Sequence, residues 1–178
     1  VVVSPLVALM TNQAAAINDR IRGEPAVYLG SAQNDRTKDR QVLKGRHCIV
    51  YVSPEKLVTY GFLNALVTAH RDTTNPMHVV MFAIDEAHCI SSWGHDFRPD
   101  YAKLNQIRTC FGHKVPIMAL TATSGPKVRG DIVRTLQLRT PVVFSSSADR
   151  PNLAISIRPT RSLAESQWRH LCAPIVRA

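Results

Sequence analysis

The chain has 178 residues, of which 45% are hydrophobic and 20% charged, and this ordinary globular composition excludes a wholly disordered, collagen-like or coiled-coil chain. Lys and Arg together number 22 against 13 Asp and Glu, so the formal net charge is +9, which favours a polyanionic partner and above all nucleic acid. The four cysteines include no C-x-x-C pair, and no apolar run reaches the ~18 residues of a membrane span, so we expect a reducing intracellular setting and no membrane partner.

Short apolar runs alternate with helix-like stretches along the chain, which is the pattern of a parallel α/β sheet. Strands are expected at residues 1–4, 26–29, 47–52, 78–84, 115–120, 142–144 and 153–157. Helices are expected at residues 6–20, 35–43, 61–70, 101–111 and 126–136. Ser53-Pro54-Glu55 has the composition of a further helix start. The segment 78–84 is apolar almost throughout, as in a strand that is buried on both faces.

The strongest chemical signal is Asp85-Glu86-Ala87-His88, directly after this apolar segment. Ligands of open α/β sheets bind at the carboxyl ends of the strands, so these two carboxylates fall where a ligand is expected. One could hold Mg²⁺ through its waters, and the other could polarise a water molecule for attack on a phosphoryl group. The alternative is an acidic helix start that complements the helix dipole, with His88 as a structural histidine.

Residues 89–101 concentrate aromatic and cationic side chains, although aromatic residues make up only 6% of the chain. The side chains concerned are Trp93, His95, Phe97, Arg98 and Tyr101. Exposed rings beside an Arg form a stacking and phosphate-binding surface for single-stranded nucleic acid. The alternative is a hydrophobic plug that anchors a long loop.

Thr121-Ala-Thr-Ser124 follows the expected strand at 115–120 and places hydroxyl groups at the same edge of the sheet. These hydroxyls could hydrogen-bond a phosphate or the Asp85-Glu86 loop, and Thr123 or Ser124 could also cap the next helix. The following segment, 125–130, has the G-x₄-G spacing of a phosphate-binding loop. That loop needs Lys and then Ser or Thr next, whereas this chain has Asp131, which would repel phosphate.

In this order, the motifs resemble those of the RecQ family of DNA helicases, in helicase superfamily 2. The resemblance covers residues 1–158 and rests on the segments 2–13, 28–33, 50–56, 84–101, 119–123 and 149–153. The acidic motif joined to the aromatic-rich loop is diagnostic of RecQ, and the segment 28–33 is most similar to the Werner-type members.

The resemblance implies a role for each of these residues. Asp85 would hold the Mg²⁺ of Mg-ATP, and Glu86 would activate the hydrolytic water. His88, with Thr121 and Thr123, would link the nucleotide site to the DNA site. Single-stranded DNA, alone or at a junction with duplex, would be contacted by Ser4, Pro5, Trp93, His95, Phe97 and Arg98.

The fold that the resemblance implies is a RecA-like, P-loop NTPase-type parallel sheet with helices on both faces. It would lack the strand of the phosphate-binding loop (Walker A), which should precede residue 1. Residues 1–158 would form part of the first ATP-binding lobe, and residues 159–178 an unassigned tail or the start of a linker. A second lobe with its arginine finger, and a zinc-binding region, would belong to the parent protein outside this chain.

The parent is therefore expected to be an ATP-dependent 3′-to-5′ DNA helicase of repair and recombination, in the nucleus of a eukaryotic source and otherwise in the cytoplasm. This chain alone should bind single-stranded DNA weakly without turning over ATP, because it lacks the phosphate cradle and the arginine finger. Two alternatives stay open: a catalytically dead nucleic-acid-binding fragment, and a superfamily 2 helicase that acts on RNA, against which the aromatic-rich loop argues.

Overall fold

The computed structural model describes residues 1–30, 36–93, 96–147 and 150–153. The chain forms two compact units, Val1–Pro141 and Val142–Ala178, and every helix and strand of the described residues lies in the first. Residues 142–147 have no regular structure, so the strand expected at 142–144 is wrong: no described strand pairs with it. Most of the strand expected at 153–157, and the whole tail after it, lie outside the described residues.

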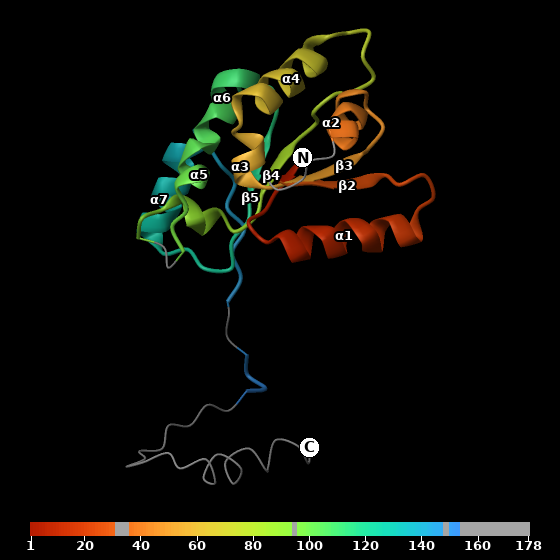
Figure 1. Ribbon diagram of the computed structural model, residues 1–178. Helices are drawn as coiled ribbons and strands as arrows, with labels where there is room; N and C mark the ends of the chain where they lie inside the picture. The colour runs from red at the N-terminus through yellow and green to blue at the C-terminus, as the bar shows by residue number, and fades with distance from the viewer. Residues whose placement is uncertain (31–35, 94–95, 148–149, 154–178) are drawn as a thin grey trace, which may run out of the picture. The chain divides into compact units, whose positions relative to one another are not determined.

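The first unit is built on a five-stranded sheet in the order β2-β3-β1-β4-β5 (Figure 1). Its strands are β1 (Val2–Val3), β2 (Ala26–Leu29), β3 (Ile49–Val52), β4 (Phe82–Ile84) and β5 (Ile117–Ala119). Every neighbouring pair is parallel, and Val3 lies in register with Val52 on one side and Ile84 on the other. The predicted parallel α/β class is confirmed, and the carboxyl ends of β1, β4 and β5 lie side by side at one edge.

Helices fill the connections between the strands. They are α1 (Val7–Arg20), α2 (Arg36–Leu43), α3 (Pro54–Leu57), α4 (Tyr60–Arg71), α5 (Pro99–Ala102), α6 (Gln106–Phe111) and α7 (Pro126–Thr135), with 3₁₀ turns η1 (Ala87–Ile90) and η2 (Lys103–Asn105). The helix start predicted at Ser53 is confirmed, since its side chain accepts the Lys56 N–H at 3.3 Å and Pro54 opens α3.

Helices cover both faces of the sheet, as expected (Figure 1). On one face, α1 packs Met10 and Ala14, one helical turn apart, against Ala26 and Tyr51 of the strands. The remaining buried apolar residues form a larger cluster with the opposite face, to which α4 contributes Leu66. Because the middle strands are covered on both sides, the ends of these strands are held rigidly.

The apolar segment 78–84 is a strand only over its last three residues, contrary to expectation. Phe82 and Ile84 are fully buried, whereas Val80 is 80% exposed and residues 78–81 are not in a strand. The partner strand explains the difference: β1 begins at Val2, opposite Ala83, and the Val1 amino group donates to the Met81 carbonyl at 2.9 Å, so residues 78–80 lie beyond the start of β1. Hydrophobicity alone therefore overestimates the strand.

The helix expected at 101–111 is broken into α5, η2 and α6. Tyr101, Leu104 and Ile107 follow one another at intervals of three residues and are at most 1% exposed. A 3₁₀ turn has three residues per turn, so it keeps such residues on one line, whereas an α-helix would rotate them out of line. The core therefore selects the tighter turn at this point.

Arg108 is a buried cation at the end of α6, only 8% exposed. Its guanidinium donates to three carbonyl oxygens: Val115 at 2.7 Å, Gly112 at 3.1 Å and Leu136 at 3.2 Å. Burial, and then the charge of Arg139, lower the pKa of Arg108. The side chain ties the end of α6 to the segment entering β5 and to the end of α7.

His70, at the end of α4, makes the free energy of unfolding depend on pH. Its Nδ1 accepts the Val79 N–H at 3.2 Å, and its ring packs against His78 and Phe111. Burial, and then the charges of His78 and Arg71, lower the pKa of His70 below its ordinary value of 6.5. The unfolded chain therefore takes up this proton more readily, so the stabilisation is present above about pH 6.5 and is lost as the pH falls.

We expect the urea midpoint of the chain to fall as the pH is lowered from neutrality through this window. His70→Asn should flatten this dependence, because an amide oxygen can still accept the Val79 N–H but does not titrate. His47→Asn, in the segment entering β3, is the control and should keep the wild-type slope. An equal slope in the wild type and in His70→Asn would remove His70 as the cause.

The strand order leaves β2 and β5 at the edges of the sheet. On β5 and just after it, Met118 and Leu120 are each more than 40% exposed. A strand in this position presents unpaired backbone N–H and C=O groups along its outer side. Within the described part of the chain, no helix combines the length and the apolar character needed to cross a bilayer.

Candidate nucleotide site and aromatic loop

Polar side chains follow three neighbouring strands at the edge where these strands end. Ser4 follows β1, Asp85 follows β4, and Thr121 comes two residues after β5. Backbone hydrogen bonds continue the sheet into this region, since the Asp85 N–H donates to Val3 and the Ala87 N–H donates to Leu120. The sheet therefore brings together residues from three separate motifs of the sequence.

The Asp85 carboxylate is held from both sides. One oxygen accepts the Ser4 hydroxyl at 3.1 Å, and the other accepts the Glu86 N–H at 3.0 Å. The backbone carbonyl of Asp85 accepts the hydroxyl of Tyr101 at 2.9 Å. Tyr101 is fully buried, and burial above all raises the pKa of its phenol, so the hydroxyl stays protonated and keeps this bond at neutral pH. The chain thus orients Asp85 before any ligand binds.

Glu86 bends the chain sharply at the strand end. Its backbone lies in the left-handed region, at φ 47° and ψ 43°, which costs a non-glycine residue about 1 kcal/mol or more. Glu86 occupies the cap position before η1, and its side chain makes no capping hydrogen bond to this turn. The bend leaves the Glu86 side chain about one-third exposed, where water can reach its carboxylate.

His88 connects the acidic motif to the loop after β5. Its Nδ1 lies 3.0 Å from the Thr121 hydroxyl and 3.2 Å from a Glu86 carboxylate oxygen. The Thr121 hydroxyl donates its own proton to the Thr123 carbonyl at 3.0 Å and accepts the Thr123 N–H at 3.3 Å. Since this hydroxyl has no second proton, Nδ1 of His88 is the donor to both Thr121 and Glu86.

The alternative in which Thr123 or Ser124 caps α7 is not what the structure shows. The residue at the cap position is Gly125, and the structure shows no side-chain hydrogen bond to this end of the helix. Thr121 and Thr123 are instead tied to each other by the Thr121 hydroxyl. The loop after β5 is therefore shaped by its contact with the acidic motif and not by the helix that follows.

The aromatic-rich loop is largely exposed, which argues against the alternative of a hydrophobic plug. Trp93 is 70% exposed and Phe97 45% exposed, whereas Tyr101 is buried beneath the acidic motif. The Arg98 guanidinium pairs with the Asp96 carboxylate at 3.1 Å, and this bond above all raises the pKa of Arg98. His95 lies outside the described residues.

Ser4 and Pro5, the two residues before α1 that are expected to contact DNA, differ in their exposure. Ser4 is only 1% exposed, and its hydroxyl is directed to Asp85, so the structure places it in the carboxylate site and not on an open surface. Pro5 is half-buried. A DNA contact by either residue stays a prediction.

Comparison with known proteins assigns the chain to a family. The DEAD/DEAH box helicase family matches residues 1–130, which is most of the chain. The chain is a DEAD/DEAH box helicase family member. Its relatives include the ATP-dependent DNA helicase RecQ of Pasteurella multocida, 42% identical over 160 residues, which are 88% of this chain and 23% of that protein. The resemblance to RecQ helicases is confirmed.

The chain is also similar to other proteins that are longer than itself. The ATP-dependent helicase wrn-1 of Caenorhabditis elegans is 39% identical over 93% of this chain and 15% of its own length. The solved helicase domain of Hef from Pyrococcus furiosus matches with a TM-score of 0.49 and 16% identity, over 77% of this chain and 27% of that one. This chain spans about a quarter or less of the length of these curated relatives.

The donor atoms of the site fit a magnesium-bound nucleotide but not a metal held by protein alone. Among the described residues of this family member, no group of three or more His, Cys, Asp or Glu side chains could hold a metal ion. Mg²⁺ usually takes one or two carboxylates and completes its shell with water and substrate phosphates. The oxygens of Asp85 and Glu86 supply this limited set, so the family's use of a nucleotide is compatible with the site.

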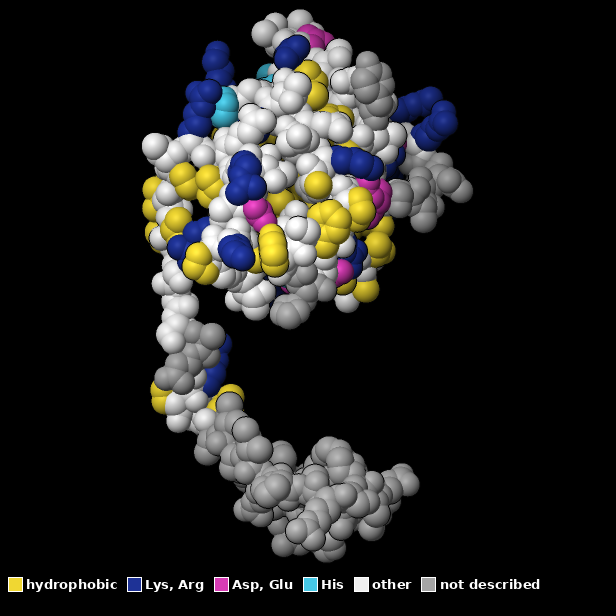
Figure 2. All heavy atoms as spheres, turned by 90° about the vertical axis from the view of Figure 1, so that its left-hand side faces the viewer, with side chains coloured by type: hydrophobic (Ala, Val, Ile, Leu, Met, Phe, Trp, Pro, Cys, Tyr) yellow, Lys and Arg dark blue, Asp and Glu magenta, His cyan; other side chains and the backbone are white. Residues whose placement is uncertain are grey.

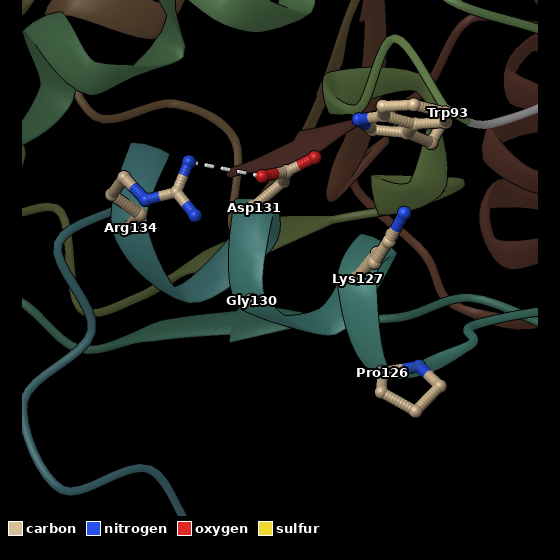
Figure 3. A pocket seen from close by; sticks show the side chains of 6 residues that line it. All are labelled: Trp93, Pro126, Lys127, Gly130, Asp131 and Arg134. Atoms are coloured by element: carbon tan, nitrogen blue, oxygen red, sulfur yellow. Dashed lines mark hydrogen bonds and ion pairs between the residues drawn. The ribbon is translucent and has the colours of Figure 1, made fainter.

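Sequence reasoning missed the residues that orient the functional ones. It placed Tyr101 among the exposed aromatic residues, and it gave no role to Ser91 or Lys127. Ser91 is 1% exposed and donates to Asp131 on α7, and Lys127 lies over the Trp93 ring (Figure 3). The three-residue spacing of Tyr101, Leu104 and Ile107 is a signal that could have indicated the burial of Tyr101. The contact between Ser91 and Asp131 spans forty residues and leaves no such signal in the sequence.

Proposed function

We propose that this chain is part of the first ATP-binding lobe of an ATP-dependent 3′-to-5′ DNA helicase of the RecQ type, which couples ATP hydrolysis to unwinding in repair and recombination. One observation carries the proposal: the acidic motif, Ser4 and the loop after β5 meet at one sheet edge, and exposed aromatic rings follow directly. The similarity to the ATP-dependent DNA helicase RecQ and to the ATP-dependent helicase wrn-1 supports it. The nucleus of a eukaryotic source, or the cytoplasm of a bacterial one, is the corresponding place of action.

The acidic motif would serve the nucleotide. The Ser4 hydroxyl and the Glu86 N–H orient the Asp85 carboxylate. The lone pairs of its oxygens that these two bonds do not use would hold Mg²⁺. When bound, Mg-ATP supplies the phosphoryl group that reacts, and its Mg²⁺ neutralises part of the negative charge of the phosphates. Glu86 would accept the proton of the attacking water, and the His88 Nδ1–H would hold the Glu86 carboxylate in place.

The aromatic-rich loop would serve the DNA. Trp93 and Phe97 offer exposed rings on which bases can stack, and Arg98 offers a guanidinium for a phosphate. Figure 2 shows Lys and Arg side chains over the face of the first unit that carries α5 to α7, interspersed with hydrophobic side chains. Since the loop begins within η1, where His88 also lies, the Thr121–His88 contact would connect DNA binding to nucleotide turnover.

The test is binding of labelled oligodeoxythymidine to the chain, followed by fluorescence anisotropy over a range of salt. Trp93→Ala should lower the affinity by about 5-fold to 150-fold, because base stacking contributes about 1–3 kcal/mol. Arg98→Ala should reduce the slope of log K against log salt by about 0.7, the value for one phosphate contact to a single strand. Arg22→Ala, exposed at the turn between α1 and β2, is the matched control and should keep the wild-type slope.

Three results would contradict parts of the proposal. Unchanged binding in both loop variants would make the aromatic-rich loop structural. Tighter binding of oligouridine than of oligodeoxythymidine would favour a helicase that acts on RNA. DNA-stimulated ATP turnover by this chain alone, retained at high purity, would contradict the need for a separate phosphate cradle and arginine finger.

A further inference from the structure

A groove runs between the aromatic-rich loop and α7, beside the site described above. Its lining residues are Trp93, Pro126, Lys127, Gly130, Asp131 and Arg134 (Figure 3). All but Trp93 come from α7, a helix to which neither the motifs nor the proposed function assigns a role. The groove therefore adds a second wall to the surface that carries Trp93.

Lys127 approaches one face of the Trp93 ring. Its ammonium lies 4.3 Å from the ring centroid, within the range of a cation–π contact. Because Trp93 is 70% exposed, a large part of its ring surface stays open to a stacking partner. A base stacked on this ring would bring its own phosphate near the same ammonium, since base and phosphate are joined through one sugar.

Asp131 connects α7 to the turn that carries Trp93. Its carboxylate accepts the Ser91 hydroxyl at 2.6 Å, and the oxygen of that hydroxyl accepts the backbone N–H of Trp93 at 3.2 Å. Arg134 pairs with the other oxygen of Asp131 at 3.0 Å. Ser91 is buried and the Asp131 side chain is 21% exposed, so this chain of hydrogen bonds is partly shielded from water.

The charge of Asp131 does not exclude a phosphate from the groove. Both of its carboxylate oxygens are engaged, one by a hydroxyl and one by the Arg134 cation. Lys127 has no carboxylate partner in the described part of the structure and stays available for an incoming anion. The groove therefore combines one accessible ring with one accessible cation, which is the combination that single-stranded nucleic acid requires.

We propose that α7 forms part of the single-strand binding surface, with Lys127 contacting the phosphate of a nucleotide whose base stacks on Trp93. In this arrangement Asp131 is a positioning residue that fixes Trp93 through Ser91. The inference rests on the proposed contact between the aromatic-rich loop and DNA, and it extends that contact to a helix outside the loop.

The Lys127 contact is tested by oligodeoxythymidine binding to the complete 178-residue chain over a range of salt. Lys127→Gln should weaken binding at low salt and reduce the slope of log K against log salt by about 0.7. Lys114→Gln is the matched control, because it removes the same charge from an exposed lysine at the opposite, amino end of β5. Equal slopes in the two variants would overturn the Lys127 contact.

The positioning role is tested by comparing Asp131→Asn with Asp131→Ala. Both variants remove the same charge, but only the Asn side chain can still accept the Ser91 hydroxyl. Asp131→Asn should bind DNA at least as tightly as the wild type, and Asp131→Ala should bind several-fold more weakly than Asp131→Asn. Ser91→Ala removes the other partner of the same bond and should behave like Asp131→Ala. Equal affinities of Asp131→Ala and Asp131→Asn would overturn the role.

A spectroscopic measurement separates a positioning effect from a loss of folding. The chain has two tryptophans, so in a Trp168→Phe background Trp93 is the only indole fluorophore. Asp131→Ala should lower the steady-state anisotropy of Trp93 while the far-UV circular dichroism stays unchanged, and Asp131→Asn should restore the anisotropy. If Trp93→Ala weakens DNA binding while all the α7 and Ser91 variants bind like the control, the loop contact holds and this inference fails. If Trp93→Ala also has no effect, the proposed function of the loop fails first.

Discussion

Replacing Glu86 with Gln is expected to lower ATP turnover at least about 100-fold in the longer helicase of which we propose this chain is a part. The amide has nearly the same shape as the carboxylate but cannot accept the proton of the attacking water. Its oxygen can still accept the Nδ1–H of His88, so the arrangement around the bend should survive. Nucleotide binding should be retained, because Asp85 and its contacts with Ser4 are untouched.

The measurement is single-turnover ATP hydrolysis together with the Kd of a fluorescent nucleotide, each with and without single-stranded DNA. Glu24→Gln is the control: it makes the same change in an exposed residue two positions before β2, at the amino end of the sheet. This variant should turn over ATP at the wild-type rate. Normal turnover in Glu86→Gln would remove Glu86 as the group that activates water.

Arg108→Ala is expected to lower the free energy of unfolding by about 2–4 kcal/mol. The substitution removes three charge-assisted hydrogen bonds and leaves the carbonyls of Gly112, Val115 and Leu136 without their donor. In the wild type, burying the guanidinium costs free energy, since no carboxylate of the described residues pairs with it. The substitution removes this cost as well, so the net loss of stability is smaller than the three bonds alone would give. The three carbonyls belong to different segments, so the loss should also loosen α7 against α6.

The measurement is urea unfolding followed by circular dichroism. The midpoint should fall while the slope of the free energy of unfolding against urea concentration stays constant. Arg129→Ala, exposed on α7, is the control and should change the stability by no more than about 0.5 kcal/mol. Arg108→Lys should fall between the two, because one ammonium cannot reach three divergent carbonyls with the geometry of a guanidinium. A loss of less than about 1 kcal/mol in Arg108→Ala would mean that desolvation offsets the three bonds.

The sequence predicts the frame of the site well because the parallel sheet obeys simple rules. The strand at 26–29 ends where expected, and the acidic motif lies at the end of a central strand. Once a chain alternates short apolar runs with helices, the strands are parallel and their carboxyl ends meet at one edge. The meeting of the motifs containing Asp85 and Thr121 is expected from that geometry, whereas the proximity of Ser4 to Asp85 depends on the strand order, which places β1 beside β4.

The bonds within the site could not be predicted, because they depend on side-chain directions. Nothing in the sequence separates a Ser4 hydroxyl that faces DNA from one that faces Asp85, which is where the structure places it. Tyr101 differs in part: the apolar spacing with Leu104 and Ile107 indicates a buried ring, but nothing in the sequence indicates the bond from its hydroxyl to the Asp85 carbonyl. Contacts such as Ser91 with Asp131 join residues whose separation carries no periodic signal.

No strand of the described residues pairs with the outer side of β5, and this has a consequence for handling the isolated chain. The backbone groups of β5 can pair with any extended segment that arrives in register, and the exposed Met118 and Leu120 side chains would be covered by the same event. A second molecule supplies such a segment as readily as a neighbouring stretch of a longer polypeptide. Concentrated samples of this chain should therefore self-associate through the sheet margin, and a charged residue introduced there would be the way to keep them monomeric.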